Sequence, residues 1–180
     1  MQRPQTESLP AALAPAQAAA LLQASGAAVQ AELNAAPEAS LAWHPAPGEW
    51  CVKETLGHIL EAERRGFNGR IQRILQEQEP ALPGWDQQAV ARERQDCARP
   101  LPDLLKEFAD LRADSLRLVA GLQPADLARG GEHEKVGYLR VADLLHEWVH
   151  HDRNHLKQML SNIQAYVWPN MANAQKFAGE

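Results

Sequence analysis

The chain has 180 residues, of which 45% are hydrophobic and 23% are charged, enough apolar sequence to bury the core of one globular domain. Its net charge of −5 provides no general basic surface for nucleic acid. The first fifteen residues contain three prolines and no continuous apolar run, so they resemble neither a signal peptide nor a membrane span. We therefore expect a single-domain protein that binds neither nucleic acid nor membranes.

The two cysteines, Cys51 and Cys97, do not form a CxxC pair. This spacing favours reduced thiols over a disulfide framework or a zinc knuckle, and it predicts a cytoplasmic location. Cys51 also stands where the N-cap of a helix is expected, with Glu54 three residues later as in a capping box. A thiol at a helix N-terminus can be reactive, but a buried and inert thiol is the commoner case.

The chain alternates between long stretches of helical periodicity and long connections rich in proline and glycine. The predicted elements are an N-terminal arm (1–14), helices at 15–34, 52–78, 102–122 and 141–166, a crossover at 79–100 with a short helical turn near 87–94, and a C-terminal tail (171–180). No strand-like alternation is visible. The pattern predicts an all-α fold, a four-helix bundle at 15–170 whose long connections permit neighbouring helices to run parallel.

The last predicted helix carries four histidines within ten positions, and these form two competing pairs. His146 and His150 match the HExxH pattern of zinc peptidases, whereas His151 and His155 form a second pair at i, i+4. On a helical wheel His151 and His155 lie beside the apolar sector that contains Trp148, and the other pair lies on the opposite side. The wheel therefore predicts that His151 and His155 face the bundle and that His146 and His150 face solvent.

A zinc peptidase is the sharpest rival interpretation, with Glu147 as general base. The sequence lacks the H-x-x-G-x-x-H extension, because position 153 is Arg and position 156 is Leu. After His150 the only glutamate is the terminal Glu180. A chance match to HExxH is easy in a segment so rich in histidine, so the peptidase is the less favoured reading.

A further candidate ligand, His58, lies on the second predicted helix. Its wheel position flanks the apolar stripe of Leu56, Phe67 and Ile74. This position suits a site at the seam of the bundle and equally suits a surface histidine. Asp152, in turn, falls in the buried sector of the last helix and requires a partner there, either a ligand imidazole or an arginine of another helix.

Two segments, GEWCVKETLGHILEAER and, some ninety residues later, GYLRVADLLHEWVHHDRNHLKQM, resemble the DinB/YfiT-like superfamily of metalloenzymes. The resemblance implies a four-helix bundle in which His58, His151 and His155 bind one divalent metal ion, with Gln158 in the position that usually follows. It also implies a homodimer. The chain departs from the family pattern at Cys51, where Ser is usual, and at Arg140, where Thr is common.

Three imidazoles from two helices leave coordination positions open, so the ion could activate a water molecule or a substrate thiol. Imidazole suits several metals, among them zinc, nickel, iron, copper and manganese. We expect a divalent-metal-dependent enzyme acting on a small molecule, either a hydrolase or a transferase that uses a low-molecular-weight thiol. No catalytic residue beyond the ligands is assigned. The alternatives are a metal-binding or stress-related interaction protein without turnover and a structural bundle that binds no metal.

Overall fold

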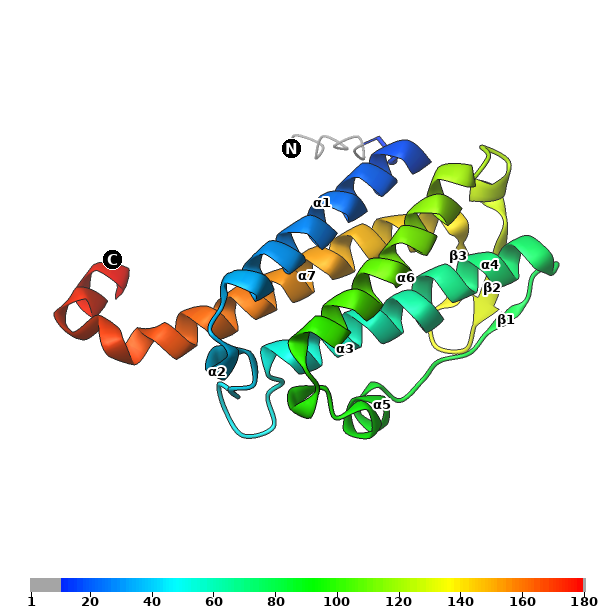
Figure 1. Ribbon diagram of the computed structural model, residues 1–180. Helices are drawn as coiled ribbons and strands as arrows, with labels where there is room; N and C mark the ends of the chain where they lie inside the picture. The colour runs from blue at the N-terminus through cyan, green and yellow to red at the C-terminus, as the bar shows by residue number, and fades with distance from the viewer. Residues whose placement is uncertain (1–10, 180) are drawn as a thin grey trace, which may run out of the picture.

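The computed structural model describes residues 11–179, in which four long helical segments pack side by side (Figure 1). This confirms the predicted four-helix bundle, while the first ten residues of the predicted N-terminal arm lie outside the described residues. The segments are α1 (Pro15–Ala35), the continuous run α3 (Val52–Glu61), η1 (Ala62–Asn68) and α4 (Gly69–Gln76), α6 (Leu101–Gly121), and α7 (Val141–Val167).

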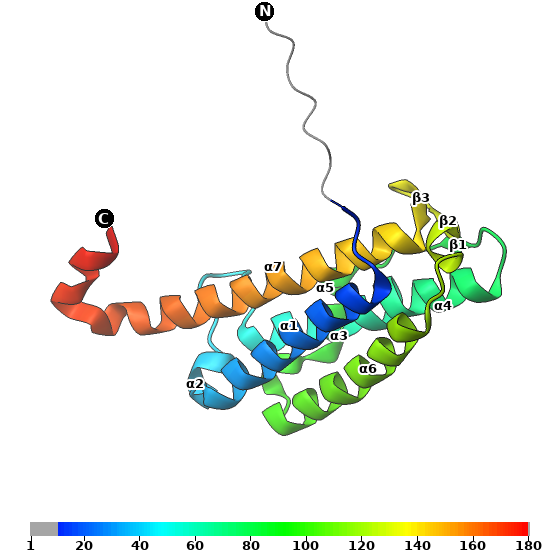
Figure 2. The same cartoon turned by 90° about the horizontal axis from the view of Figure 1, so that it is seen from above.

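The long connections make two pairs of helices parallel. Helices α1 and α7 run in one direction, and the run from α3 to α4 and helix α6 run in the other (Figures 1 and 2). Helix α1 packs against both α6 and α7, and α3 packs against both of them as well. Because α3 faces α7 directly, residues from the second and last segments can meet inside the bundle.

The core consists of large apolar side chains from all four segments. Trp148 of α7 is fully buried and stacks on Phe67, with ring centroids 5.2 Å apart. Phe108 of α6 is fully buried near the other end of the bundle, against Leu33 of α1 and Leu56 of α3. Complete burial of side chains of this size supplies the main favourable contribution to folding.

The second segment is interrupted by the π-helical turn η1, which the sequence did not predict. Gly69 follows this turn, and a Cβ atom at its position would lie 2.4 Å from the carbonyl oxygen of Arg64. Glycine therefore permits a close approach of the backbone that alanine would obstruct. A wide turn of this kind adds one residue to the helical repeat and changes which face the residues before it present to the core.

The connections carry structure of their own. They contain α2 (Glu38–Leu41), β1 (Ala81–Leu82), α5 (Gln87–Arg94), η2 (Asp96–Ala98), η3 (Asp126–Ala128), β2 (Gly130–His133) and β3 (Gly137–Arg140). The predicted helical turn at 87–94 is confirmed by α5. The expectation of no strands was wrong, because β2 pairs antiparallel with β3 and parallel with β1 in a small sheet of order β1-β2-β3.

The C-terminal part of α7 continues beyond the bundle and leads into η4 (Trp168–Gly179), as Figure 1 shows in orange and red. Val167, Trp168 and Phe177 are exposed on this projection. Among the described residues no helix combines the length and the apolar character that a membrane crossing requires.

Candidate metal centre

His58, His151 and His155 come together in the interior, where α3 faces α7. Each offers a ring nitrogen, and these nitrogens all lie within 4.8 Å of one another. His151 and His155 are one turn apart on α7, with ring centroids separated by 4.4 Å, and the His58 Nε2 atom lies 3.0 Å from that of His151. The structure therefore brings together the three residues predicted as ligands, and metal binding itself stays a prediction.

The position of His58 differs from the helical-wheel expectation. The wheel placed it beside the core stripe, but only 7% of the residue is exposed. Trp50 and Trp85 enclose its ring at centroid distances of 5.0 and 5.8 Å. The tryptophans come from the loop before α3 and from the crossover, so regular spacing in the sequence could not predict this enclosure.

The environment keeps the three imidazoles neutral. Burial, together with the nearby His155, lowers the pKa of His58 to about 4. Burial, again with neighbouring histidines, lowers the pKa of His151 to about 3. The pKa of His155 is lowered too, chiefly by burial. All three rings are thus unprotonated near pH 7, and neutral imidazole is the form that binds a metal ion.

The hydrogen bonds of the three rings fit a metal centre. His155 Nδ1 lies 2.9 Å from the side-chain oxygen of Gln158, which fixes the proton on Nδ1 and leaves the Nε2 lone pair free. Among the described residues, the buried Nδ1 atoms of His58 and His151 have no hydrogen-bond partner. Three neutral imidazoles match the donor set of zinc and related divalent ions.

The HExxH residues do not form a comparable site. His150 and Glu147 are exposed, as predicted. His146 was expected to face solvent, but it is half-buried. Its Nε2 accepts a hydrogen bond of 2.9 Å from the backbone N–H of Leu13, and its Nδ1 lies 2.7 Å from the carbonyl oxygen of Ala142. With both ring nitrogens of His146 engaged, the pair lacks a shared metal position.

Asp152 pairs with an arginine of another helix, which is the second of the two partners predicted for it. It is buried and accepts a hydrogen bond of 2.6 Å from Arg112 of α6. The same guanidinium donates to Glu63 of η1 at 2.8 Å and to the carbonyl oxygen of Leu22 at 2.7 Å. Burial raises the pKa of Glu63, although Arg112 acts in the opposite direction. Arg112 could have been noticed in the sequence, because Phe108, Arg112, Ser115 and Val119 share one face at helical spacing.

A pocket of about 220 Å³ opens beside His151. Phe67 and Trp85 contribute aromatic walls, and Arg70 and Lys135 contribute positive charge. The exposed Glu147 lies at the same pocket. Lys135 follows β2, so the unpredicted sheet supplies part of the pocket, and only the tertiary fold brings it to Arg70.

The expectation of reduced cysteines was wrong. Cys51 and Cys97 form a disulfide, with Cα atoms 6.8 Å apart. Residues 46 positions apart meet because η2 packs against the start of α3. Cys51 is nevertheless the N-cap of α3, as predicted, since its Sγ accepts the Glu54 backbone N–H at 3.4 Å. The disulfide removes reduced thiols as an argument for a cytoplasmic location.

Comparison with known proteins agrees with the fold. The family model of the DinB superfamily matches residues 4–159. YfiT from Bacillus subtilis, described as a probable metal-dependent hydrolase with an unusual four-helix bundle topology, superposes with a TM-score of 0.78 at 18% identity, covering 92% of this chain and 97% of its own. The four-helix bundle protein TT2238 superposes with a TM-score of 0.62 at 22% identity, covering 82% and 98%.

None of the curated proteins matches the chain. The two structural likenesses, at under a quarter identity, establish the bundle topology alone. The family match is different in kind, because it spans most of the sequence and includes the segments that hold His58, His151 and His155. The chain belongs to the DinB superfamily.

Proposed function

We propose that this protein is a divalent-metal-dependent enzyme that acts on a small anionic molecule. The observation that carries the proposal is the convergence of three imidazoles from two helices, one buried and two half-buried, beside an open pocket. A bound divalent ion would supply a Lewis acid there and would lower the pKa of a water molecule or thiol.

Residues of the chain would hold the ion, orient its ligands and shield the pocket from water. His58, His151 and His155 would hold the ion, and Gln158 orients His155 through its Nδ1. The three ligands come from rigid helices, so the geometry of the site requires little rearrangement. Phe67 and Trp85 shield one side of the pocket from water, because both are packed against the histidines.

The substrate class follows from the charges of the pocket. Arg70 is half-buried at the pocket, and burial lowers the pKa of its guanidinium although the nearby Glu147 acts in the opposite direction. A carboxylate or phosphate group of a substrate would pair with this guanidinium, with Lys135 adding a second positive charge. We favour hydrolysis of a small anionic substrate. Transfer to a low-molecular-weight thiol is the second candidate, because a thiol that carries a carboxylate would suit the same charges.

Metal analysis of protein purified without an affinity tag or chelator tests the site. With the Cys51–Cys97 disulfide intact, we expect His155→Ala to abolish tight binding of zinc, nickel, iron or manganese, because only two imidazoles of the centre would remain. The matched control His146→Ala removes another histidine of α7 and should leave the metal content unchanged. The reverse order would restore the peptidase reading, and no effect of either change would leave the histidines structural.

Kinetics then separate enzyme from metal-binding protein. Screening should compare pairs of esters, amides and thiol acceptors that differ only in an anionic group. Arg70→Gln should raise KM for the anionic member of a pair at least about tenfold and leave the neutral member nearly unchanged, as expected for loss of a charge-assisted hydrogen bond. A metal-loaded protein with no turnover of either class would favour a non-catalytic binding protein.

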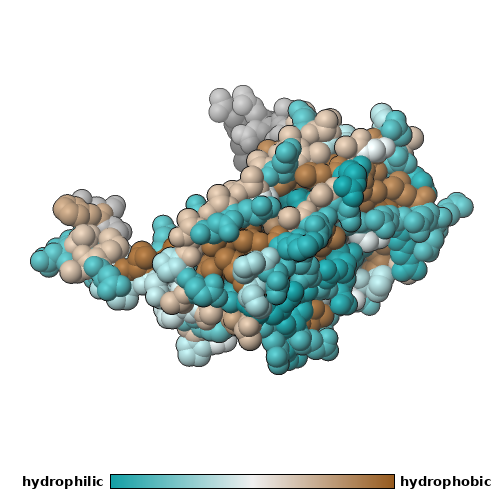
Figure 3. Space-filling view, viewed as in Figure 1, coloured by the Kyte–Doolittle hydropathy of each residue, from teal (hydrophilic) through white to brown (hydrophobic). Residues whose placement is uncertain are grey.

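We also propose a homodimer formed through α1. Exposed alanines at helical spacing leave one face of α1 without large side chains: Ala16, Ala20, Ala24, Ala27 and Ala31. Figure 3 shows a pale brown band of weakly hydrophobic residues along α1. Small residues permit close approach of two helices. Light scattering should give about twice the chain mass of 19.9 kDa, and Ala24→Glu should reduce it to the monomer value. A monomer in the unaltered protein would contradict the proposal.

A further inference from the structure

A second group of metal-ligating side chains surrounds the start of α3. It consists of His44 from the loop after α2, Cys51 and Glu54 from the N-terminus of α3, and Cys97 from η2. Their potential ligand atoms all lie within 4.8 Å of one another, although the residues come from three separate parts of the chain. None of them belongs to the histidine centre.

The contacts within the group are specific. His44 Nε2 lies 3.0 Å from the Glu54 carboxylate and 3.7 Å from Cys97 Sγ. The same carboxylate oxygen accepts the backbone N–H of Cys51 at 2.9 Å, and Cys51 Sγ accepts the backbone N–H of Glu54. The imidazole thus stands between a sulfur and a carboxylate, with the second sulfur adjacent.

Two thiolates, one imidazole and one carboxylate are a tetrahedral zinc donor set. Ligand atoms around tetrahedral zinc are separated by about 3.3 to 3.8 Å, within the spread observed here. Thiolates also favour zinc over magnesium or calcium, which prefer oxygen ligands. We propose that His44, Cys51, Glu54 and Cys97 form a second metal site, which binds one zinc ion when the Cys51–Cys97 disulfide is reduced.

Reduction of the disulfide precedes zinc binding. Two molecules of an external thiol reduce the disulfide, giving two protein thiols and one external disulfide. Zinc binding then releases the two thiol protons, because thiolate is the form that binds the metal. The disulfide and the zinc complex use the same two sulfur atoms, so each state excludes the other.

Access to the disulfide is one-sided. Cys51 is fully buried, whereas Cys97 and His44 reach the surface. An external thiolate therefore attacks Cys97 Sγ and releases the Cys51 thiolate. That leaving group receives the Glu54 backbone N–H at the helix N-terminus, where negative charge is stabilised.

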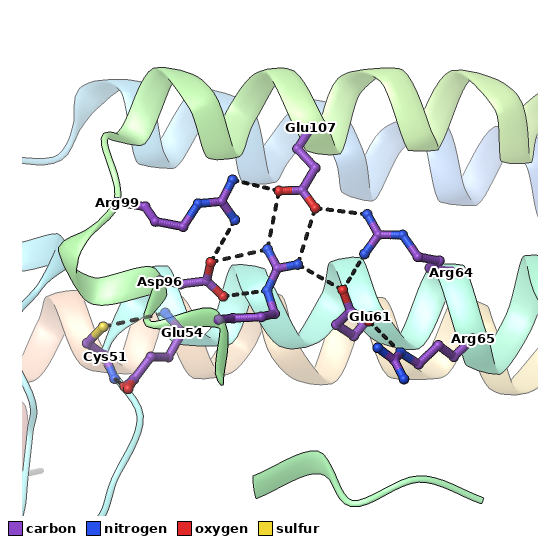
Figure 4. A network of polar contacts seen from close by, with 9 residues as sticks. Cys51, Glu54, Glu61, Arg64, Arg65, Asp96, Arg99 and Glu107 are labelled. Carbon is purple, nitrogen blue, oxygen red and sulfur yellow. Dashed lines mark hydrogen bonds and ion pairs between the residues drawn. The ribbon is translucent and has the colours of Figure 1, made fainter. Parts of the chain in front are cut away.

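Either state ties η2 to α3, and this matters because η2 follows α5. Val90, Ala91 and Arg94 of α5 line a small pocket together with His58. Arg94 adds an ionic attachment, donating to Asp96, Glu61 and Glu107. Figure 4 shows these three carboxylates in one network of polar contacts. In a reducing environment, bound zinc would take the place of the disulfide in holding η2 against α3.

The test uses the full chain with His155→Ala, which removes the first centre. Zinc per chain is measured after desalting, with the disulfide either intact or reduced by a phosphine, which is a weak zinc ligand. We expect one zinc ion per reduced chain and none per oxidised chain. Cobalt(II) added to the reduced chain should give the charge-transfer absorption of a thiolate complex.

Two variants in the same background identify the ligands. Cys97→Ser should abolish the cobalt–thiolate absorption, with circular dichroism confirming the fold. His44→Ala should weaken zinc binding by about tenfold or more, because even an outer partner of a zinc ligand is worth that much. It should still form the disulfide, as thiol counting will show. His150→Ala, an exposed histidine outside the group, is the control.

The proposal is overturned if the reduced chain binds no more zinc than the oxidised chain. It is also overturned if His44→Ala or Cys97→Ser binds zinc as tightly as the control. Because the first centre is absent from this background, these results are independent of whether the histidine centre binds metal.

Discussion

Replacing Arg112 by methionine would leave two buried carboxylates without their cation. Arg112, Glu63 and Asp152 are each at most 5% exposed at the side chain, and the guanidinium is the hydrogen-bonding partner of both carboxylates. Methionine preserves most of the apolar stem and removes the guanidinium, which lies 5.0 Å from the centroid of the Phe108 ring. The loss then reports mainly on charge.

The expected loss is large relative to the stability of a domain. Removing one partner of a buried ion pair destabilises a protein by about 3 to 5 kcal/mol, because the remaining charge stays desolvated. Total stability is about 5 to 15 kcal/mol, so the variant should retain its fold with a much lower unfolding midpoint. Urea denaturation followed by circular dichroism measures the difference. Arg117→Met is the control, because the Arg117–Asp114 pair on the same helix is exposed and should contribute at most about 1 kcal/mol.

The pH dependence has a definite sign. Without Arg112 the pKa of Glu63, already raised by burial, should rise further, so the folded state binds a proton that the unfolded state releases. Stability from such a group is complete below the unfolded carboxyl pKa of about 4.3 and is lost as pH rises through the folded value. The deficit of Arg112→Met should therefore shrink between pH 7 and pH 4. A loss below about 1 kcal/mol at pH 7, or a deficit that grows on acidification, would refute the reasoning.

Two further predictions concern the attachment of the crossover. Gly57→Ala would place a Cβ atom 1.7 Å from the Asp96 carboxylate, so it should destabilise the protein by about 1 to 3 kcal/mol in urea denaturation. Gly121→Ala, whose Cβ meets nothing within 4 Å, is the control and should not change the stability. Equal effects of the two changes would contradict the close packing. Burial alone would raise the pKa of Glu107, but hydrogen bonds from three arginines lower it to about 2. The contribution of Glu107 to folding stability is therefore present above the unfolded pKa of about 4.3 and is lost as pH falls towards 2. Glu107→Gln should be less stable at pH 7 and lose less stability over that range, and parallel pH curves for the two proteins would contradict the assignment.

The main helices were predictable because their apolar residues repeat with helical periodicity over twenty or more positions. The predicted segments 15–34, 102–122 and 141–166 agree with α1, α6 and α7 to within one residue at each end. Strands β1 to β3 were missed because they are two to four residues long, and Gly130 and Gly131 show no apolar alternation. In addition, β1 pairs with β2 across about fifty positions.

The candidate site was predictable where it lies on one regular helix. The i, i+4 spacing of His151 and His155 fixes their relation without knowledge of the fold. His58, Trp85 and Lys135 meet this pair only through tertiary packing, and the wheel for His58 assumed 3.6 residues per turn throughout a segment that contains η1. The partner of Asp152 and the Cys51–Cys97 bond were undetermined for the same reason, since each joins residues at least 40 positions apart.

The wide turn η1 also makes the second segment unusually sensitive to its own length. His58 precedes the turn, and Ile71 and Ile74 follow it, so one surplus residue sets the angle between the histidine and the apolar stripe. Deleting a single residue from 62–68 would restore an ordinary helix and rotate the two halves relative to each other by about 100°. Either the histidine or the isoleucines would then leave the interior. Related chains that keep both inside must therefore keep the number of residues in this turn.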